Sequence, residues 1–184
     1  KNDGQDFVYP GEISCCIAHY SILKMAKEIG LRNIFILEDD CVFHKNFNEL
    51  LPQYLDLLPE DWDFFYLYLM QFQWYHNDLR SDYIYKDGVM KLYRPFEAHC
   101  ASSYGVSAKA IPNLLHLLDT DFRIVDSRYR LMQRERSKYN IWGVFPNLCG
   151  QDYDISNIRG DDKTKLDYFQ NVVTFGNNKK EDYL

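Results

Sequence analysis

The sequence has little positive charge, no paired-cysteine motif and no long apolar run. Its 21 Lys and Arg residues are outnumbered by 27 Asp and Glu residues, and the net charge is −6. This balance argues against nucleic acid or an anionic membrane surface as the main partner. The longest apolar run, Phe64 to Met70, is far shorter than the roughly 20 residues that cross a bilayer, so we expect no membrane span.

The five cysteines do not form a zinc or redox motif. None of them shows the C-x-x-C spacing typical of such sites, and we interpret all five as reduced core thiols: Cys15, Cys16, Cys41, Cys100 and Cys149. Residues 1–10 also lack the positively charged and apolar regions of a signal peptide. We therefore expect a cytoplasmic location, with the ER lumen or a membrane-associated position left open in case a targeting segment was removed.

Length and composition indicate an ordinary globular chain. The 184 residues correspond to one domain at about 150 residues per domain. With 46% apolar and 26% charged residues, the composition is that of a folded protein. We predict a single domain over residues 1–184, in which periodicity is lost toward the end and residues 155–184 form a loop-rich tail.

Periodicity predicts alternating helices and strands. Apolar residues recur at helical spacing from Ile13 to Ile29, which predicts a helix with a broad buried face, and Gly30 follows at the position of a C-cap glycine. The run Ile34 to Leu37 predicts a buried strand that ends at Glu38.

Further elements are expected along the rest of the chain. Pro52 suits the next predicted helix only if it lies in or near the first turn. The expected elements are a helix over 47–58, a central strand over 63–69, an edge hairpin of 83–85 and 89–93 around Asp87-Gly88, a strand over 100–106, a helix over 108–118 with Ser107 as its N-cap, and a strand over 141–145. The fold class is therefore α/β.

The most informative feature is the acidic triplet Glu38-Asp39-Asp40 at the end of a predicted strand. Open α/β sheets bind their ligands at the carboxyl ends of strands. Adjacent carboxylates repel one another unless a cation offsets their charge, and oxygen ligands select hard cations such as Mg²⁺ or Mn²⁺. The triplet thus predicts a metal that bridges to a diphosphate, although a solvated acidic turn explains it equally well.

Several segments in order resemble a known family. These segments are Gly11 to His19, Ile36 to Asp40, Leu58 to Asp63 with Tyr66-Leu67, Tyr104 to Ala110, and Asp126 with Gln151 to Ser156. In this order they resemble glycosyltransferase family 25, the lipooligosaccharide and procollagen galactosyltransferases, which carry G-x-x-G-C-x-x-S-H, L-E-D-D and L-P-x-D-W-D. Ser14 and Ala18 depart from the first motif by replacing one small residue with another.

The resemblance implies a GT-A-like nucleotide-sugar fold, with a mixed central sheet flanked by helices and the acidic triplet acting as a DxD-like motif. It also implies an opening strand with an Asn-Leu-x-x-Arg stretch that helps to hold the nucleotide. Residues 1–10 contain no such stretch, so we expect the N-terminal strand to be absent.

The resemblance further implies roles for individual residues. Asp40 and Glu38 would hold Mn²⁺ (or Mg²⁺), with Asp39 orienting or sharing the metal. The remaining donor-site residues would be Gly11, His19, Gln151 and Ser156. A histidine on the broad face of a helix is, however, more often a core histidine with satisfied hydrogen bonds than a ligand.

The resemblance is to inverting enzymes, which need a general base for the acceptor hydroxyl. Asp126 is the first candidate and Asp154 the second. Alternatively, Asp126 is a loop aspartate that pairs with a neighbouring arginine. The nearby basic run, Arg128 to Lys138, is expected to form a solvated face.

Three functions remain open from the sequence. The first is a metal-dependent inverting transferase that moves a hexose, by resemblance galactose, from a UDP-sugar to a glycan or a hydroxylated side chain. The second is a degenerate transferase domain that binds glycan or a protein partner without turnover. The third is a Mg²⁺-dependent phosphohydrolase built on the triplet, which would need further carboxylates on neighbouring strand ends.

Overall fold

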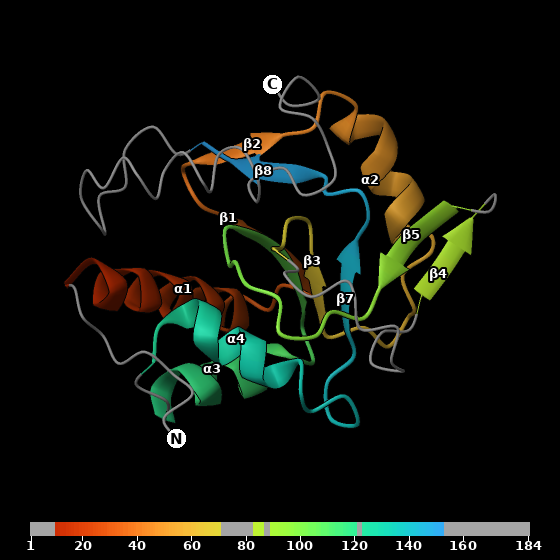
Figure 1. Cartoon of the computed structure of the whole chain (residues 1–184). Helices are drawn as coiled ribbons and strands as arrows, with labels where there is room; N and C mark the ends of the chain where they lie inside the picture. The colour runs from red at the N-terminus through yellow and green to blue at the C-terminus, as the bar shows by residue number, and fades with distance from the viewer. Residues whose placement is uncertain (1–9, 71–82, 87–88, 121–122, 153–184) are drawn as a thin grey trace.

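A six-stranded mixed sheet organises the molecule, and helices lie on both of its faces (Figure 1). The computed structural model describes residues 10–70, 83–86, 89–120 and 123–152. The strand order is β1-β6-β3-β7-β5-β4, in which β3 and β7 are parallel and every other neighbouring pair is antiparallel. The strands are β1 (Asn33–Leu37), β3 (Phe64–Tyr66), β4 (Tyr83–Lys86), β5 (Val89–Tyr93), β6 (Ser103–Ser107) and β7 (Ile141–Val144).

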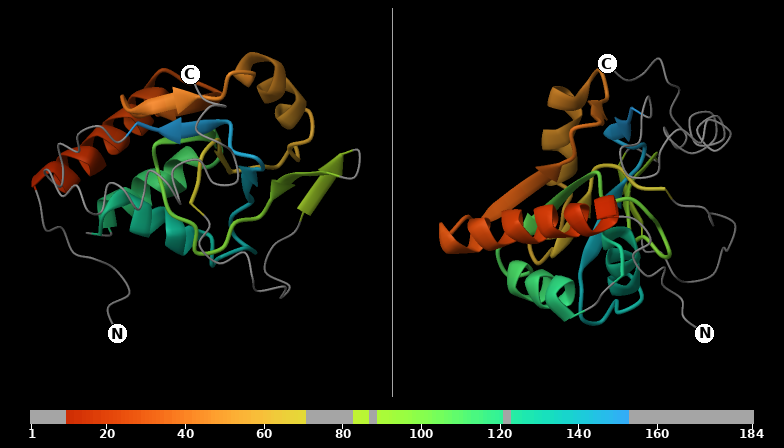
Figure 2. Two further views of the ribbon diagram at one scale, coloured as in Figure 1. Left: turned by 45° about the horizontal axis from the view of Figure 1, so that its top comes forward. Right: turned by 90° about the vertical axis from the view of Figure 1, so that its left-hand side faces the viewer.

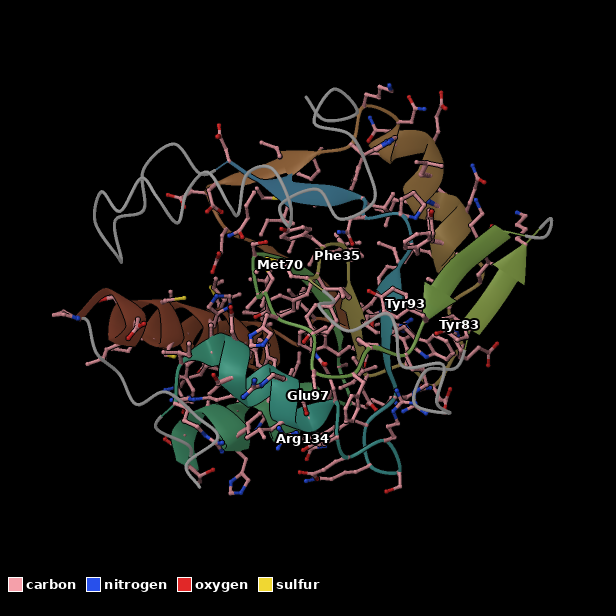
Figure 3. The ribbon with its side chains drawn as sticks, viewed as in Figure 1. Phe35, Met70, Tyr83, Tyr93, Glu97 and Arg134 are labelled. Carbon is pink, nitrogen blue, oxygen red and sulfur yellow. The ribbon has the colours of Figure 1, made fainter. Side chains whose placement is uncertain are left out.

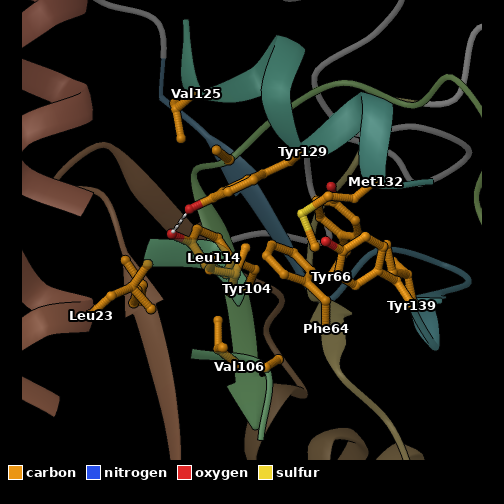
Figure 4. Packing of buried hydrophobic residues seen from close by; sticks show 14 of the residues in the cluster. Leu23, Phe64, Tyr66, Tyr104, Val106, Leu114, Val125, Tyr129, Met132 and Tyr139 are labelled. Carbon is orange, nitrogen blue, oxygen red and sulfur yellow. Dashed lines mark hydrogen bonds between the residues drawn. The ribbon is translucent and has the colours of Figure 1, made fainter. Parts of the chain in front are cut away.

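Three helices cover one face of the sheet: α1 (Pro10–Glu28), α3 (Ile111–Thr120) and α4 (Val125–Met132). Because side chains alternate along a strand, Phe64 and Tyr66 of β3 point into this layer, where they pack with Leu23, Leu114 and Tyr129 (Figure 4). This layer forms the larger core of the molecule.

The opposite face is covered by α2 (Phe47–Leu55) and by a separate two-stranded ribbon of β2 (Cys41–Phe43) and β8 (Cys149–Gln151). Phe65, the residue between Phe64 and Tyr66, points to this side and packs in one cluster with Tyr54 and Trp142. Figure 2 shows the ribbon beside α2, on the side away from α3 and α4. The antiparallel register places Cys41 opposite Gln151, which brings residue 151 next to the end of β1.

Most of the predicted elements are present. The helix that ends before Gly30 exists, and Gly30 has a φ of 71°, as expected for a C-cap glycine. The central strand, the edge hairpin and the strand near residue 141 are confirmed, as is the mixed sheet. The last predicted helix begins at Ile111, after a turn, and Ser107 is not its N-cap, because this residue ends β6. The predicted tail over 155–184 lies outside the described residues.

Two predictions about burial are wrong. The buried face of α1 is narrow, because α3 and α4 contact it along one stripe, and Ile17 and Met25 remain 59% and 54% exposed. The strand after α1 lies at an edge of the six-stranded sheet and is buried on one face only, where Ile36 is 3% exposed. Since α2 covers the sheet farther from this edge, Phe35 and Leu37 of β1 are each 43% exposed.

Two local expectations also fail. Pro52 is the sixth residue of α2 and does not lie in its first turn, and the helix ends three residues later, at Leu55. The basic run is not simply a solvated face. Arg128 is buried and donates a hydrogen bond to the Leu118 carbonyl at 2.7 Å, and Arg134 pairs with Glu97 (Figure 3). No helix among the described residues has the length and apolar character needed to cross a bilayer.

Candidate functional site

The acidic triplet lies where the sheet meets the β2–β8 ribbon. The backbone N–H of Glu38 donates to the Ser102 carbonyl at 2.8 Å and continues the β1–β6 ladder by one residue. Two residues later, the Asp40 carbonyl accepts from the Asp152 N–H at 2.8 Å. Glu38 and Asp40 are half-buried, and Asp39 between them is exposed. The backbone therefore separates the three carboxylates into different environments.

Gln151 joins two of these carboxylates. Its side-chain amide donates to Asp40 Oδ2 at 3.2 Å and to Glu38 Oε2 at 3.5 Å. Its carbonyl oxygen accepts from the Cys100 thiol at 3.5 Å, and the Cys100 backbone has a φ of 101°, in the left-handed region that non-glycine residues rarely adopt. The expected proximity of Gln151 to the triplet is thus observed, and β8 is the element that provides it.

His19 reaches the triplet from the opposite side. Its Nε2 lies 3.2 Å from Glu38 Oε1, and its Nδ1 lies 2.6 Å from the Tyr104 hydroxyl. That hydroxyl is in turn 3.0 Å from the hydroxyl of Tyr129 (Figure 4). His19 as a whole is only 3% exposed. His19 is therefore a buried histidine with both ring nitrogens paired, and one of its partners belongs to the triplet.

Cys15 is a site residue that the sequence interpretation missed. Its thiol lies 3.6 Å from Glu38 Oε1. Burial raises the pKa of this thiol, and the negative charges of Glu38 and Asp126 raise it further. The signal was available in the sequence, because Cys15 and His19 are four residues apart, and this spacing places two side chains on the same face of a helix.

Burial also perturbs Asp40. Loss of solvent raises the pKa of its carboxyl to about 6, and the charge of Glu38 adds to the increase. The hydrogen bond from Gln151 acts in the opposite direction but does not cancel it. Among the described residues, no positive charge offsets these two effects on the pKa of Asp40.

The other predicted residues are placed as follows. Asp126 lies in the first turn of α4, near enough for its charge to raise the pKa values of Cys15 and Tyr66. Gly11 is the second residue of α1. Asp154 and Ser156 lie outside the described residues. Of the predicted set, the structure brings together Glu38, Asp40, Gln151 and His19.

Comparison with known proteins identifies the relatives of this chain. The family model described as glycosyltransferase family 25 (LPS biosynthesis protein) matches residues 5–122. Two curated relatives, each called "Probable inactive glycosyltransferase 25 family member 3", are 35% identical (Bos taurus) and 37% identical (Rattus norvegicus) over 60 residues.

These 60 residues are 31% of this chain and 10% of the length of either relative. The family match itself is much wider, since residues 5–122 include all of α1 and the acidic triplet and are well over half of the 184 residues. The chain therefore belongs to glycosyltransferase family 25.

Proposed function

We propose that the chain is a GT-A-like, metal-dependent inverting glycosyltransferase domain, which moves a hexose from a UDP-sugar to a hydroxyl group. Galactose is the sugar that the family resemblance favours, and a glycan or a hydroxylated side chain is the acceptor. The observation that carries the proposal is the pair of half-buried carboxylates, Glu38 and Asp40, bridged by Gln151 at the end of β1. Family membership supports the reaction class.

The residues present fit a hard divalent cation. Asp40 supplies carboxylate oxygens whose pKa is raised to about 6 by burial and by Glu38, and a cation would relieve both effects. Glu38 Oε2 lies on the same side, since the one amide of Gln151 contacts it and Asp40. Asp40 and Glu38 would hold Mn²⁺ or Mg²⁺, and exposed Asp39 would orient or share it. When bound, the metal neutralises charge on the departing UDP.

The protein must also remove a proton from the acceptor. In an inverting transfer the acceptor oxygen forms a bond to the anomeric carbon as the bond to the diphosphate breaks, and a carboxylate takes the hydroxyl proton. We assign this role first to Asp126, and the assignment is supported by the effect of its charge on the pKa of Cys15, which lies beside Glu38. Asp154 remains the second candidate. Gly11, His19, Gln151 and Ser156 are proposed to contact or support the donor.

A second function is favoured by a specific observation, namely that both curated relatives are called probably inactive. In this alternative the domain binds glycan or a protein partner and does not catalyse transfer. A Mg²⁺-dependent phosphohydrolase has less support, because β3 and β7, the parallel neighbours in the sheet, end in apolar or aromatic residues and not in carboxylates.

A transfer assay separates these alternatives. UDP release is measured from a panel of UDP-hexoses with glycan and hydroxylated-peptide acceptors, in the presence of Mn²⁺. We expect acceptor-dependent release, and we expect Asp126→Asn to lower kcat by roughly 100- to 10,000-fold, the usual contribution of a general base. Glu49→Gln, which removes an exposed carboxylate from the first turn of α2, is the control. Retained glycan or protein binding, without UDP binding and without UDP release, would favour the non-catalytic alternative.

A further inference from the structure

A second cluster of potential ligands lies on the other side of Glu38 from Asp40. Glu38 Oε1 is 3.2 Å from His19 Nε2 and 3.6 Å from Cys15 Sγ, and all three atoms lie within 4.8 Å of one another. Two of the three side chains come from successive turns of α1, and the third comes from the end of β1. Among the described residues, this is the cluster of His, Cys and acidic side chains close enough to hold one ion.

The two separations that involve Glu38 match those of a tetrahedral zinc site. Zinc binds nitrogen and oxygen at about 2.0 Å and sulfur at about 2.3 Å, so tetrahedral angles place the ligand atoms roughly 3.3 to 3.6 Å apart. The two separations to Glu38, 3.2 and 3.6 Å, agree with this spacing. A thiolate and an imidazole select zinc over Mn²⁺ or Mg²⁺, which prefer oxygen. We propose that Cys15, His19 and Glu38 form a three-ligand site for Zn²⁺.

The surroundings of His19 supply an independent argument. Metal-binding histidines usually donate their second ring N–H to a fixed acceptor, which orients the ring. Here Nδ1 lies 2.6 Å from the Tyr104 hydroxyl, which is anchored by Tyr129 at 3.0 Å. When Nδ1 donates to Tyr104, the lone pair of Nε2 faces the Glu38 carboxylate. In this tautomer two acceptors lie 3.2 Å apart, and a cation between them would satisfy both.

Each Zn²⁺ that binds displaces one proton from the protein. The thiol of Cys15 loses its proton to solvent as the sulfur–zinc bond forms, while Nε2 and Oε1 donate lone pairs without further change. Three protein ligands leave a fourth position for water, as in zinc sites that are not purely structural. The side chain of Glu38 is 29% exposed, so the ion reaches the site from the Glu38 side. Asp40 is not a ligand, and this site does not depend on the proposed transferase function.

Cobalt spectroscopy of the full chain tests the proposal. The chelator-treated protein is titrated with Co²⁺, and Zn²⁺ is then added as a competitor. We expect a thiolate-to-cobalt charge-transfer band that saturates at one Co²⁺ per chain, with the strong visible bands of tetrahedral cobalt, and the loss of these bands when Zn²⁺ is added. Cys15→Ser should abolish the charge-transfer band, and His19→Gln should weaken binding by at least about tenfold.

Cys16→Ser is the matched control, because this thiol is the next residue of the same helix but points to the Arg123 carbonyl, 3.8 Å away. It should leave the bands unchanged. Cys41→Ser tests whether cobalt binds elsewhere, at the neighbouring thiols of Cys41 and Cys149. Absence of the band in the folded protein, or its loss in Cys41→Ser but not in Cys15→Ser, would overturn the proposal. In that case a proton on His19 Nε2, and not a metal ion, would account for the contact with Glu38 Oε1.

Discussion

At the scale of single residues, the three neighbouring carboxylates have different chemical environments. Glu38 is contacted on one oxygen by His19 and on the other by Gln151. Asp40 accepts a side-chain hydrogen bond from the Gln151 amide, and burial raises the pKa of its carboxyl to about 6. Asp39 is exposed. One sequence motif therefore supplies a carboxylate with a contact on each oxygen, a carboxylate with a raised pKa and an exposed carboxylate.

The raised pKa of Asp40 predicts a pH-dependent stability in the absence of metal. Its pKa rises on folding from 3.8 to about 6, so the folded state holds the proton more tightly. The associated stability is present below about pH 4 and is lost as the pH rises through 6. Asp40→Asn should therefore unfold at a higher temperature than the parent at pH 7, but not at pH 4, when both are measured in EDTA.

The control is Asp56→Asn, which changes an exposed aspartate after α2 and should not alter the pH profile. A difference between Asp40→Asn and the parent that stays constant from pH 4 to pH 7 would show that burial does not perturb this carboxyl.

The two contacts of the Tyr104 hydroxyl predict that Tyr104→Phe destabilises the protein more than Tyr129→Phe does. It contacts both His19 Nδ1 and the Tyr129 hydroxyl, and the tyrosine is fully buried. Tyr104→Phe leaves a buried imidazole nitrogen unpaired and should lower the free energy of unfolding by about 1–3 kcal/mol, whereas Tyr129→Phe removes one hydrogen bond and should cost about 1 kcal/mol. Urea denaturation measures both, and equal losses would contradict the proposed chain of contacts.

At the scale of elements, the packing around two strand glycines, Gly143 of β7 and Gly105 of β6, predicts that alanine destabilises the fold more at the first position than at the second. A Cβ at Gly143 would overlap Leu69, which is 2% exposed and has no room to move. A Cβ at Gly105 would meet Phe35 at 2.9 Å, but Phe35 is 43% exposed and can rotate away. Gly143→Ala should therefore destabilise the fold by about 1–3 kcal/mol, and Gly105→Ala by less.

Thermal unfolding of the two alanine variants tests this difference, with the parent as reference. A Gly105→Ala variant as unstable as Gly143→Ala would mean that the edge strand β1 is packed as tightly as the centre of the sheet.

Elements with strong local periodicity could be predicted from the sequence, and elements that depend on distant pairing could not. The helix before Gly30 and the hairpin around Asp87-Gly88 carry their signals within a few residues. By contrast, β2 and β8 have three residues each and are stabilised by each other across more than a hundred positions. No local pattern marks such a ribbon, so its role in bringing Gln151 to Asp40 was not foreseen.

The same distinction applies to the candidate site. Glu38 and Asp40 could be identified because three carboxylates after a strand form an unusual pattern. Cys15 was assigned to the core because its spacing to other cysteines showed nothing, although its spacing to His19 placed both on one helical face. The side of the triplet on which this face lies depends on how α1 packs against the sheet.

At the scale of the whole molecule, the site lies where two layers meet. Helix α1 belongs to the larger core on one face of the sheet, and the β2–β8 ribbon belongs to the core on the other face. Glu38 touches α1 through Oε1 and β8 through Oε2. A ligand that contacts Glu38 and Asp40 would therefore stabilise the contacts of both α1 and β8 with the end of β1.

The measurement that tests the central claim most directly is calorimetric titration of UDP into the full chain, with and without Mn²⁺. The account predicts binding that requires Mn²⁺, is lost in Asp40→Asn and is retained in Asp56→Asn, where an exposed aspartate is changed in the same way. UDP binding that is equal without the metal, or unchanged in Asp40→Asn, would contradict a nucleotide site built on the acidic triplet. So would the absence of binding to the folded parent protein.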